Sequence, residues 1–282
     1  MAAKNSGYVA LIAEAITNKK RLRALGGEWS WTKIAATNGI LLNTKALNLS
    51  FHINPESVNA NYNGTNEDLY FAQCGVSVQE LSERLREKNR SLKTTGASNG
   101  QTIAGALSTG THGAAFDFGA VPEFVVGLHI VVGATRHVWL ERKTYPVVSA
   151  SFVKKLNAEL LQDDDLFNAA LVSFGSFGFI HGVMMETTPL FLYEAHRIKT
   201  TNMDALYNLM QTLDFTNSFL PNGSERPYHF QVLINQYNLK EGAFVGAFYK
   251  RPFNTAYTPP PIYKAGASPG DENMEKRTGK KL

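Results

Sequence analysis

Apolar residues recur at helical spacing in four stretches of the chain. This spacing predicts helices over residues 6–20, 77–89, 163–180 and 201–213. The first stretch opens on Ser6, a suitable N-cap, and the second opens on Ser77 with Glu80 completing a capping box. The third opens on three aspartates, which suit the positive end of a helix dipole, and it runs into glycines.

Shorter apolar runs bounded by turn residues predict strands between these helices. The runs occupy residues 21–25, 42–62, 69–76, 124–133, 137–142 and 181–199, and the second of them is broken by a turn at Asn54-Pro55. Two later runs, 227–237 and 242–253, predict antiparallel strands joined by a turn around 240–242. The mixture of helices and strands predicts an α+β fold.

The character of the chain changes twice along its length. A first domain is expected over 1–193, and from about Thr200 a second unit begins that holds one helix and one strand pair. We assign the beginning of a second domain to 194–253. Residues 254–282 are rich in proline, glycine and charge, so we expect an extended or disordered tail there.

Composition excludes several classes of function. The formal net charge of +4 gives no reason to expect nucleic-acid binding, which needs a concentrated basic face. The single cysteine, Cys74, permits no intrachain disulfide and no zinc site built on several cysteines, and we expect no metal. Cys74 ends an apolar run, so it is interpreted as a buried strand thiol, with a reactive nucleophile as the alternative.

The sequence shows neither a secretory signal nor an apolar run long enough to span a membrane. We therefore expect a soluble protein from a reducing compartment, cytoplasmic in the simplest case, although the residues leave the compartment open.

Candidate chemistry is concentrated in three glycine-bearing segments. Residues 25–30, "LGGEWS", follow a predicted strand directly, so their amides could form a concave nest for phosphate oxygens, or simply a tight turn. They lack the spacing of a Rossmann fingerprint, and the chain has no P-loop. Residues 175–182, "GSFGFIHG", taken alone indicate a helix C-terminus with a glycine cap.

The middle segment, residues 94–113, "TTGASNGQTIAGALSTGTHG", is the most unusual part of the chain. It combines glycines that permit close backbone approach with neutral hydroxyls, and it has no charged side chain. Its glycines and hydroxyl residues include Gly96, Gly100, Gly105, Gly110, Gly113, Ser98, Thr102, Ser108, Thr109 and Thr111. A phosphate here would be held by amides, hydroxyls and helix N-termini. A close-packed Gly/Ala helix over "IAGALSTG" is the alternative, and it leaves the hydroxyls unexplained.

The middle segment resembles the flavin-binding signature of the vanillyl-alcohol oxidase and p-cresol methylhydroxylase (PCMH) superfamily. Its "QTIAGALSTGTHG" is similar to the aldonolactone (gulonolactone) oxidase-like branch. Residues 21–31 resemble the family's first pyrophosphate loop, residues 75–92 its preceding helix, and residues 165–191 its closing helix, glycine turn and strand. The resemblance covers roughly residues 7 to 193 in the family's order, which makes it far more specific than any one motif.

The resemblance implies a PCMH-type FAD-binding domain of two α+β subdomains, followed by an antiparallel-sheet cap domain that is incomplete in this chain. It implies FAD as cofactor, contacted by the matching residues. On this basis the cofactor-binding residues are Gly26, Gly27, Glu28, Trp29, Ser30, Gly96, Ser98, Thr102, Gly105, Ser108, Gly110, His112, Gly178 and Ile180.

The chain departs from the family pattern at Glu28 and Trp29, where many members carry glycine and then a histidine that in some is bonded to the flavin. Trp29 cannot form that bond, so we expect non-covalent FAD. His112 lies in the family motif, and we interpret it as a structural hydrogen-bonding residue rather than an attachment site. His181 stands where relatives often carry a hydroxyl residue, so it would lie near the cofactor or simply end a strand.

The resemblance implies an FAD-linked oxidase or dehydrogenase that oxidises an alcohol carbon of a sugar lactone, polyol or similar hydroxylated substrate, with hydride passing to flavin N5. The alternative is a non-catalytic flavin-binding or assembly subunit that kept the fold. The catalytic base of the family lies beyond the matching region, so no catalytic residue is named. We expect the chain to be a fragment, one part of a split protein whose C-terminal portion is a second chain, or a degenerate member.

Overall fold

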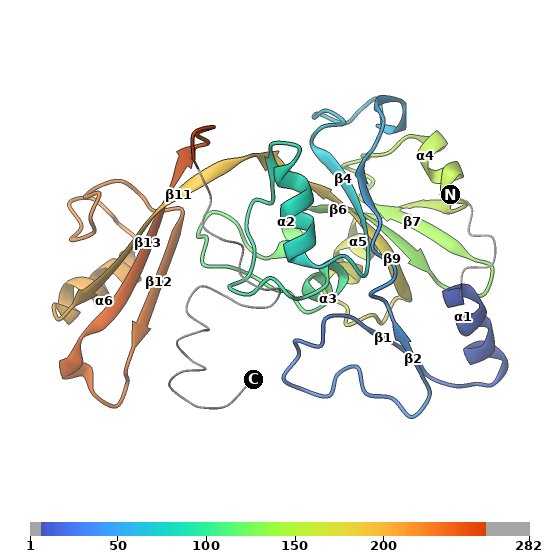
Figure 1. The fold of residues 1–282 in the computed structure, drawn as a ribbon, viewed down its shortest axis with the longest axis horizontal. Helices are drawn as coiled ribbons and strands as arrows, with labels where there is room; N and C mark the ends of the chain where they lie inside the picture. The colour runs from blue at the N-terminus through green and yellow to red at the C-terminus, as the bar shows by residue number, and fades with distance from the viewer. Residues whose placement is uncertain (1–6, 258–282) are drawn as a thin grey trace. The chain divides into compact units, whose positions relative to one another are not determined.

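The computed structural model describes residues 7–257 of the chain. These residues form two compact units, one made of 7–112 and 120–189, the other of 113–119 and 190–257 (Figure 1). The Ser6 cap and most of the expected tail, residues 258–282, lie outside the described residues. None of the helices in 7–257 has the length and apolar character that crossing a bilayer requires.

A six-stranded sheet in the order β3-β4-β9-β6-β7-β8 forms the centre of the first unit. Neighbouring strands are antiparallel except for the parallel pair of β7 and β8. The strands are β3 (Ser50–His52), β4 (Leu69–Gln73), β6 (Val125–Val131), β7 (His137–Glu141), β8 (Glu159–Gln162) and β9 (Phe179–Glu186). Two smaller sheets flank it: β1 (Leu22–Leu25) with β2 (Ile40–Asn43), and β5 (Arg90–Ser91) with β10 (Thr188–Pro189).

Helices cover both faces of the central sheet. They are α1 (Gly7–Thr17), α2 (Val78–Arg86), α3 (Ile103–Ser108), α4 (Ala150–Lys155) and α5 (Asp164–Leu171), with 3₁₀ turns η1 (Pro55–Ser57) and η2 (Val121–Phe124). Leu81 of α2, Leu107 of α3 and Phe167 of α5 belong to one core with Leu128 of β6, whereas Phe152 of α4 packs on the other face beside Trp139. Burial on both faces explains why β6 and β9 read as nearly unbroken apolar runs.

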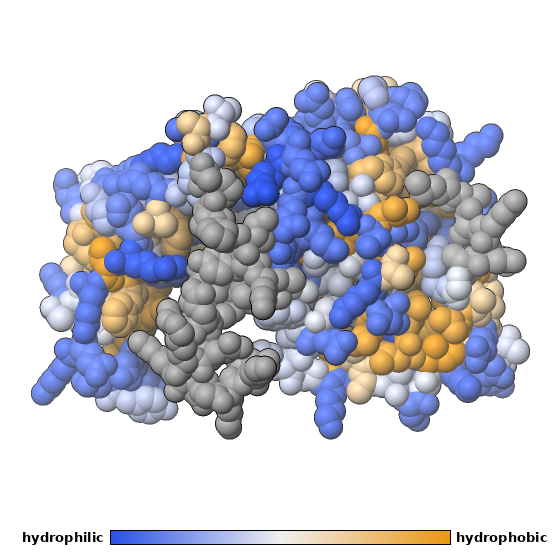
Figure 2. Space-filling view, viewed as in Figure 1, coloured by the Kyte–Doolittle hydropathy of each residue, from blue (hydrophilic) through white to orange (hydrophobic). Residues whose placement is uncertain are grey.

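Helix α1 belongs to a separate, smaller core. Tyr8 and Ile12 pack with Leu42 of β2, Cys74 and Phe179, so α1 links the β1–β2 sheet to the central sheet. Figure 2 shows apolar surface gathered around α1 and β2, where Ile16 and Leu41 are exposed.

The second unit is a three-stranded antiparallel sheet in the order β11-β13-β12 with one helix. Its elements are β11 (Phe191–Thr200), α6 (Met203–Thr212), β12 (His229–Ile234), the 3₁₀ turn η3 (Leu239–Glu241) and β13 (Ala243–Pro252). Leu206 and Leu209 of α6 pack with Val245 and Tyr249 on one face. The predicted strand pair and its turn are therefore confirmed.

The structure also confirms the capping box at Ser77 and Glu80 and the acidic start of α5, where Asp163 is the N-cap. The expected helix over 163–180 is too long: α5 ends at Leu171 with Val172 as its C-cap, before the glycines, and β9 begins at Phe179. Sequence periodicity missed α4 and β8, because both are short and β8 is half-exposed. The boundary between the units falls after Pro189 rather than at 193, because β10 pairs with β5 while β11 pairs with β13. Residues 113–119, placed in the first domain by their position in the sequence, belong to the second unit.

A hydrogen-bonded chain of histidines runs through the central sheet. The Nδ1 atoms of His129 and His181 lie 2.9 Å apart, His129 Nε2 lies 3.3 Å from His137 Nδ1, and Gln73 Nε2 lies 3.1 Å from His181 Nε2. Gln73 Oε1 accepts the backbone N–H of Leu49, so its NH₂ group must face His181. His181 and His129 then each accept on one side and donate on the other, and His137 accepts through Nδ1, which fixes all three neutral tautomers.

Protonation would break this chain, because a charged imidazole donates from both nitrogens. Burial lowers the pKa of His129 to about 3 and that of His181 to about 4. Both values lie below the ordinary value near 6.5, so the folded state binds fewer protons than the unfolded state. Their contribution to stability is therefore present above about pH 6.5 and is lost as the pH falls toward 4.

We predict that the unfolding midpoint of the protein in denaturant falls steadily between pH 7 and pH 5. His129→Gln should lower the midpoint at pH 7 and also flatten this dependence, because one of the two buried imidazoles is then missing. Leu128→Ala, next to His129 on β6 and buried in the core, is the control: it should lower the midpoint at both pH values and leave the slope unchanged, because leucine carries no titratable group. A wild-type midpoint that does not change between pH 7 and pH 5 would contradict the prediction.

Candidate functional site

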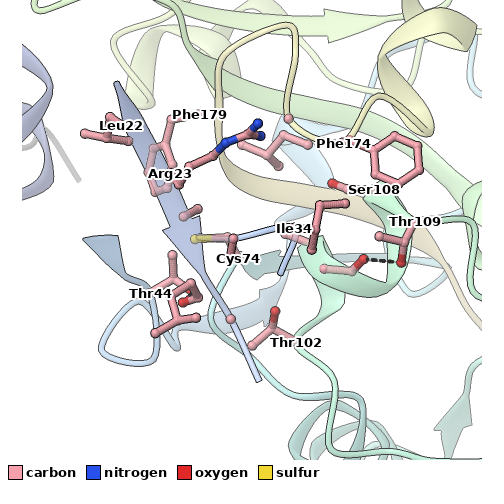
Figure 3. A pocket seen from close by; sticks show the side chains of 18 of the residues that line it. Leu22, Arg23, Ile34, Thr44, Cys74, Thr102, Ser108, Thr109, Phe174 and Phe179 are labelled. Atoms are coloured by element: carbon pink, nitrogen blue, oxygen red, sulfur yellow. Dashed lines mark hydrogen bonds between the residues drawn. The ribbon is translucent and has the colours of Figure 1, made fainter. Parts of the chain in front are cut away.

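A cavity of about 1220 Å³ opens in the first unit, and most of its lining comes from four segments of the chain. These are the C-terminal part of α1, strand β1 with the loop that follows it, helix α3 with the residues around it, and the loop before β9 (Figure 3). The cavity exceeds the usual range of drug-sized pockets, about 300–1000 Å³, so it has room for a ligand of dinucleotide size.

Strand β1 delivers the first glycine-bearing segment to the cavity. The parallel pairing of β1 with β2 holds the strand, and Thr44 fixes its end, because both its backbone N–H and its hydroxyl donate to the Leu25 carbonyl at 3.0 Å. Beyond Leu25 the chain turns through Gly26, Gly27 and Glu28, and Glu28 has a φ of 62°. The turn therefore exposes backbone amides beside the cavity instead of continuing the strand.

Glycine allows this turn to lie directly against the middle segment. A Cβ on Gly26 would overlap the Thr102 hydroxyl, and a Cβ on Gly27 would overlap the Gly100 carbonyl oxygen. A Cβ on Gly100 would lie 2.5 Å from Nε1 of the Trp29 indole. The close packing of the two segments thus requires the absence of three side chains.

The middle segment is held on its other side by α2. The Gln101 carbonyl accepts the N–H of Val78, and the Asn99 carbonyl accepts the N–H of Gln79, both at 2.9 Å. These bonds satisfy amides in the first turn of α2 that have no partner within the helix. The loop that approaches Gly27 is thereby anchored to a helix of the core.

Ten of the fourteen cofactor residues named from the sequence line this one cavity. They are Gly26, Gly27, Glu28, Trp29, Ser30, Thr102, Gly105, Ser108, Gly178 and Ile180. The structure brings them together from three segments far apart in the sequence. Their contact with the cofactor itself stays a prediction.

The other four residues, Gly96, Ser98, Gly110 and His112, are not among the lining residues. Packing explains the glycine at position 96, and backbone geometry explains the glycine at position 110. A Cβ on Gly96 would lie 2.9 Å from the Thr111 methyl group, and Gly110 follows α3 with a φ of +68°. The backbone of His112 forms a β-bridge with Ala120, which agrees with its interpretation as a structural residue.

Several lining residues were not named as cofactor residues from the sequence. Arg23 alternates with apolar residues on a short strand, and Phe174 and Phe177 belong to an irregular loop. Cys74 also lines the cavity, but burial raises the pKa of its thiol to about 12. That value keeps the thiol protonated at neutral pH, which favours a buried inert thiol over a nucleophile. Cys74 lies in the turn directly after β4 rather than in a strand as expected.

Comparison with known proteins agrees with this geometry. Residues 2–141 match the family model described as "FAD binding domain". This part of the chain is an FAD-binding domain. The chain is also 26% identical over 227 residues to the L-gulono-1,4-lactone dehydrogenase of Mycobacterium tuberculosis, a match that covers 80% of this chain and 43% of that protein.

Other proteins match similar shares of the chain. The D-arabinono-1,4-lactone oxidase of Kluyveromyces lactis is 26% identical over 214 residues, covering 75% of this chain and 36% of that protein. A crystal structure of cholesterol oxidase from B. sterolicum superposes with a TM-score of 0.58 at 18% identity, over 88% of this chain and 44% of that one. The chain thus spans less than half the length of these proteins, and the fold of the predicted superfamily is confirmed.

The residues of the FAD-binding domain fit the cofactor on structural grounds. Glycine backbones line the cavity at the turn after β1, and consecutive amides without side chains are suited to receive phosphate oxygens. Two buried side-chain atoms of lining residues, Arg23 Nε and Gln101 Oε1, have no hydrogen-bond partner within the described residues. Buried polar atoms normally have a hydrogen-bond partner, so these two unpaired atoms are what a site for a polar ligand would contain.

We predict that Gly27→Ala lowers the free energy of unfolding by about 1–3 kcal/mol, because the added methyl group forces the Gly100 carbonyl and the Trp29 ring away. FAD affinity should fall with it. Gly7→Ala is the matched control, since a Cβ there meets no atom within 4 Å. Denaturant unfolding of both variants measures the effect, and equal stability of the two would contradict the close approach.

Proposed function

We propose that this chain is the FAD-binding part of an oxidoreductase that oxidises an alcohol carbon of a sugar lactone, polyol or related hydroxylated molecule. The observation that carries the proposal is the cavity formed by Gly26–Gly27, Thr102–Ser108 and Gly178–Ile180, inside a chain whose N-terminal half is an FAD-binding domain. Proteins similar to this chain bear the names of lactone oxidases and dehydrogenases, which supports the substrate class.

A bound flavin would supply the two-electron acceptor for such an oxidation. The residues of this chain would bind and orient it. The turn after β1 would present amides to the diphosphate, and Thr102 and Ser108 would offer neutral hydroxyls. Ile103 and Leu107, both fully buried, fix α3 on the core, so these hydroxyls are presented from a rigid element.

We assign the second unit to the beginning of a substrate-binding cap. One face of its sheet is covered by α6, and the other presents Tyr193, His229 and Phe248. The Tyr193 hydroxyl lies 2.9 Å from His229 Nε2, and burial lowers the pKa of His229, which keeps the imidazole neutral and able to accept this bond. Such aromatic and polar groups suit a hydroxylated ring.

Non-covalent binding is supported by the chemistry of the cavity lining. No histidine occurs among the described residues that line it, and Trp29 stands at the position where some relatives of the family attach the flavin. The only thiol in the lining, Cys74, has its pKa raised by burial and is a poor nucleophile.

We predict that acid precipitation of the yellow protein leaves the flavin in the supernatant, with a colourless pellet. Absorbance of the supernatant near the flavin bands measures the released fraction. A pellet that keeps its colour after washing would mean covalent attachment, and its flavinylated peptide would identify the residue.

We predict that the visible absorbance of the flavin-loaded protein bleaches under anaerobic conditions when a sugar lactone or a polyol is added. A matched deoxy analogue, without the reacting hydroxyl, is the control and should leave the spectrum unchanged. If the protein is yellow but none of the lactones or polyols bleaches it, the oxidoreductase proposal is contradicted and a flavin-binding subunit is favoured. A protein that takes up no FAD would overturn the proposal altogether.

A further inference from the structure

The charges around the cavity are strongly unbalanced. Its lining contains four cationic residues, Lys19, Lys20, Arg23 and Lys33, and one acidic residue, Glu28. Within residues 7–257 none of the four cations forms an ion pair with Asp or Glu. A concave site with an excess of one sign attracts ligands of the opposite sign, so the cavity favours an anion.

Arg23 is the cation best placed to contact that anion. It lies on β1, three residues before the glycine turn, and its side chain is half-buried. Its Nε atom is buried and has no hydrogen-bond partner among the described residues. Figure 3 shows its guanidinium extending from β1 into the cavity, away from Thr102.

Such an arrangement is costly unless a ligand completes it. A buried guanidinium N–H without an acceptor loses its hydration and gains nothing in return. The planar guanidinium presents parallel N–H donors that match two oxygens of one phosphate, which a lysine cannot do. In FAD the isoalloxazine and the adenine are neutral, so the diphosphate is the only strongly anionic group.

We propose that Arg23 binds the diphosphate of FAD through its guanidinium, from the side of the cavity opposite Thr102. This inference rests on the proposed function of the cavity as the FAD site. It adds a charged side chain from β1 to the amides, hydroxyls and helix termini expected from residues 94–113. Lys19, Lys20 and Lys33 add a favourable field at longer range.

The test compares ligands that do or do not carry the diphosphate. Calorimetry on flavin-free protein gives the affinities for FAD, ADP and riboflavin, with circular dichroism and thermal unfolding as checks of folding. In Arg23→Gln the affinities for FAD and ADP should fall by about 10-fold to 100-fold, the loss of a charge-assisted hydrogen bond. Riboflavin, which has no phosphate, should bind as it does to the wild type.

Two further variants sharpen the comparison. Arg23→Lys keeps the charge and loses the planar fork, so it should recover only part of the affinity for ADP. Arg21→Gln is the matched control, because Arg21 is exposed, lies two residues earlier and does not line the cavity. It should bind all three ligands like the wild type.

The outcomes separate this inference from the FAD assignment. If Arg23→Gln binds FAD and ADP as tightly as the wild type, the inference is wrong and the FAD site stands. If the wild type binds no FAD, the proposed function itself is wrong. If Arg23→Gln does not fold, the wild-type protein provides the test. It should bind ADP at least about tenfold tighter than adenosine, and its affinity for ADP should fall with added salt. Equal affinities for ADP and adenosine would overturn the inference.

Discussion

The site depends on the direct contact of two backbone segments at glycine. The turn after β1 and the loop before α3 approach so closely that a methyl group on Gly27 would overlap the Gly100 carbonyl, and one on Gly26 would overlap the Thr102 hydroxyl. This contact places the amides of one segment and the hydroxyls of the other on the wall of one cavity. A side chain at any of these glycines would separate the segments and change the shape of that wall.

Each segment is in turn held by the hydrophobic core. The loop before α3 accepts hydrogen bonds from the first turn of α2, whose Leu81 and Leu85 are fully buried. The turn after β1 follows a strand that pairs with β2, and Leu42 of β2 packs with Tyr8 of α1. The cavity is therefore formed between elements that are rigid for reasons unrelated to the ligand, which is the condition for a pre-formed binding site.

The wall of the cavity also continues into a buried polar network. Ile180 lines the cavity, and the next residue, His181, is hydrogen-bonded to His129 and Gln73 inside the sheet. The His181 carbonyl accepts the N–H of Cys74, another lining residue. Gln73 sets the direction of the hydrogen bonds along the histidine chain, so one polar network joins β4, β9, β6 and β7.

The sequence by itself determined the local elements and the class of ligand. The capping box at Ser77 specified α2, because its residues lie within one short stretch of chain. The resemblance of residues 94–113 and the flanking motifs to a flavin-binding signature indicated an FAD-binding domain. Only the tertiary structure decided which residues of that pattern face the cavity. Gly105 does and Gly96 does not, and Arg23, which the sequence did not single out within its motif, joins the site, because these positions depend on packing partners remote in the sequence.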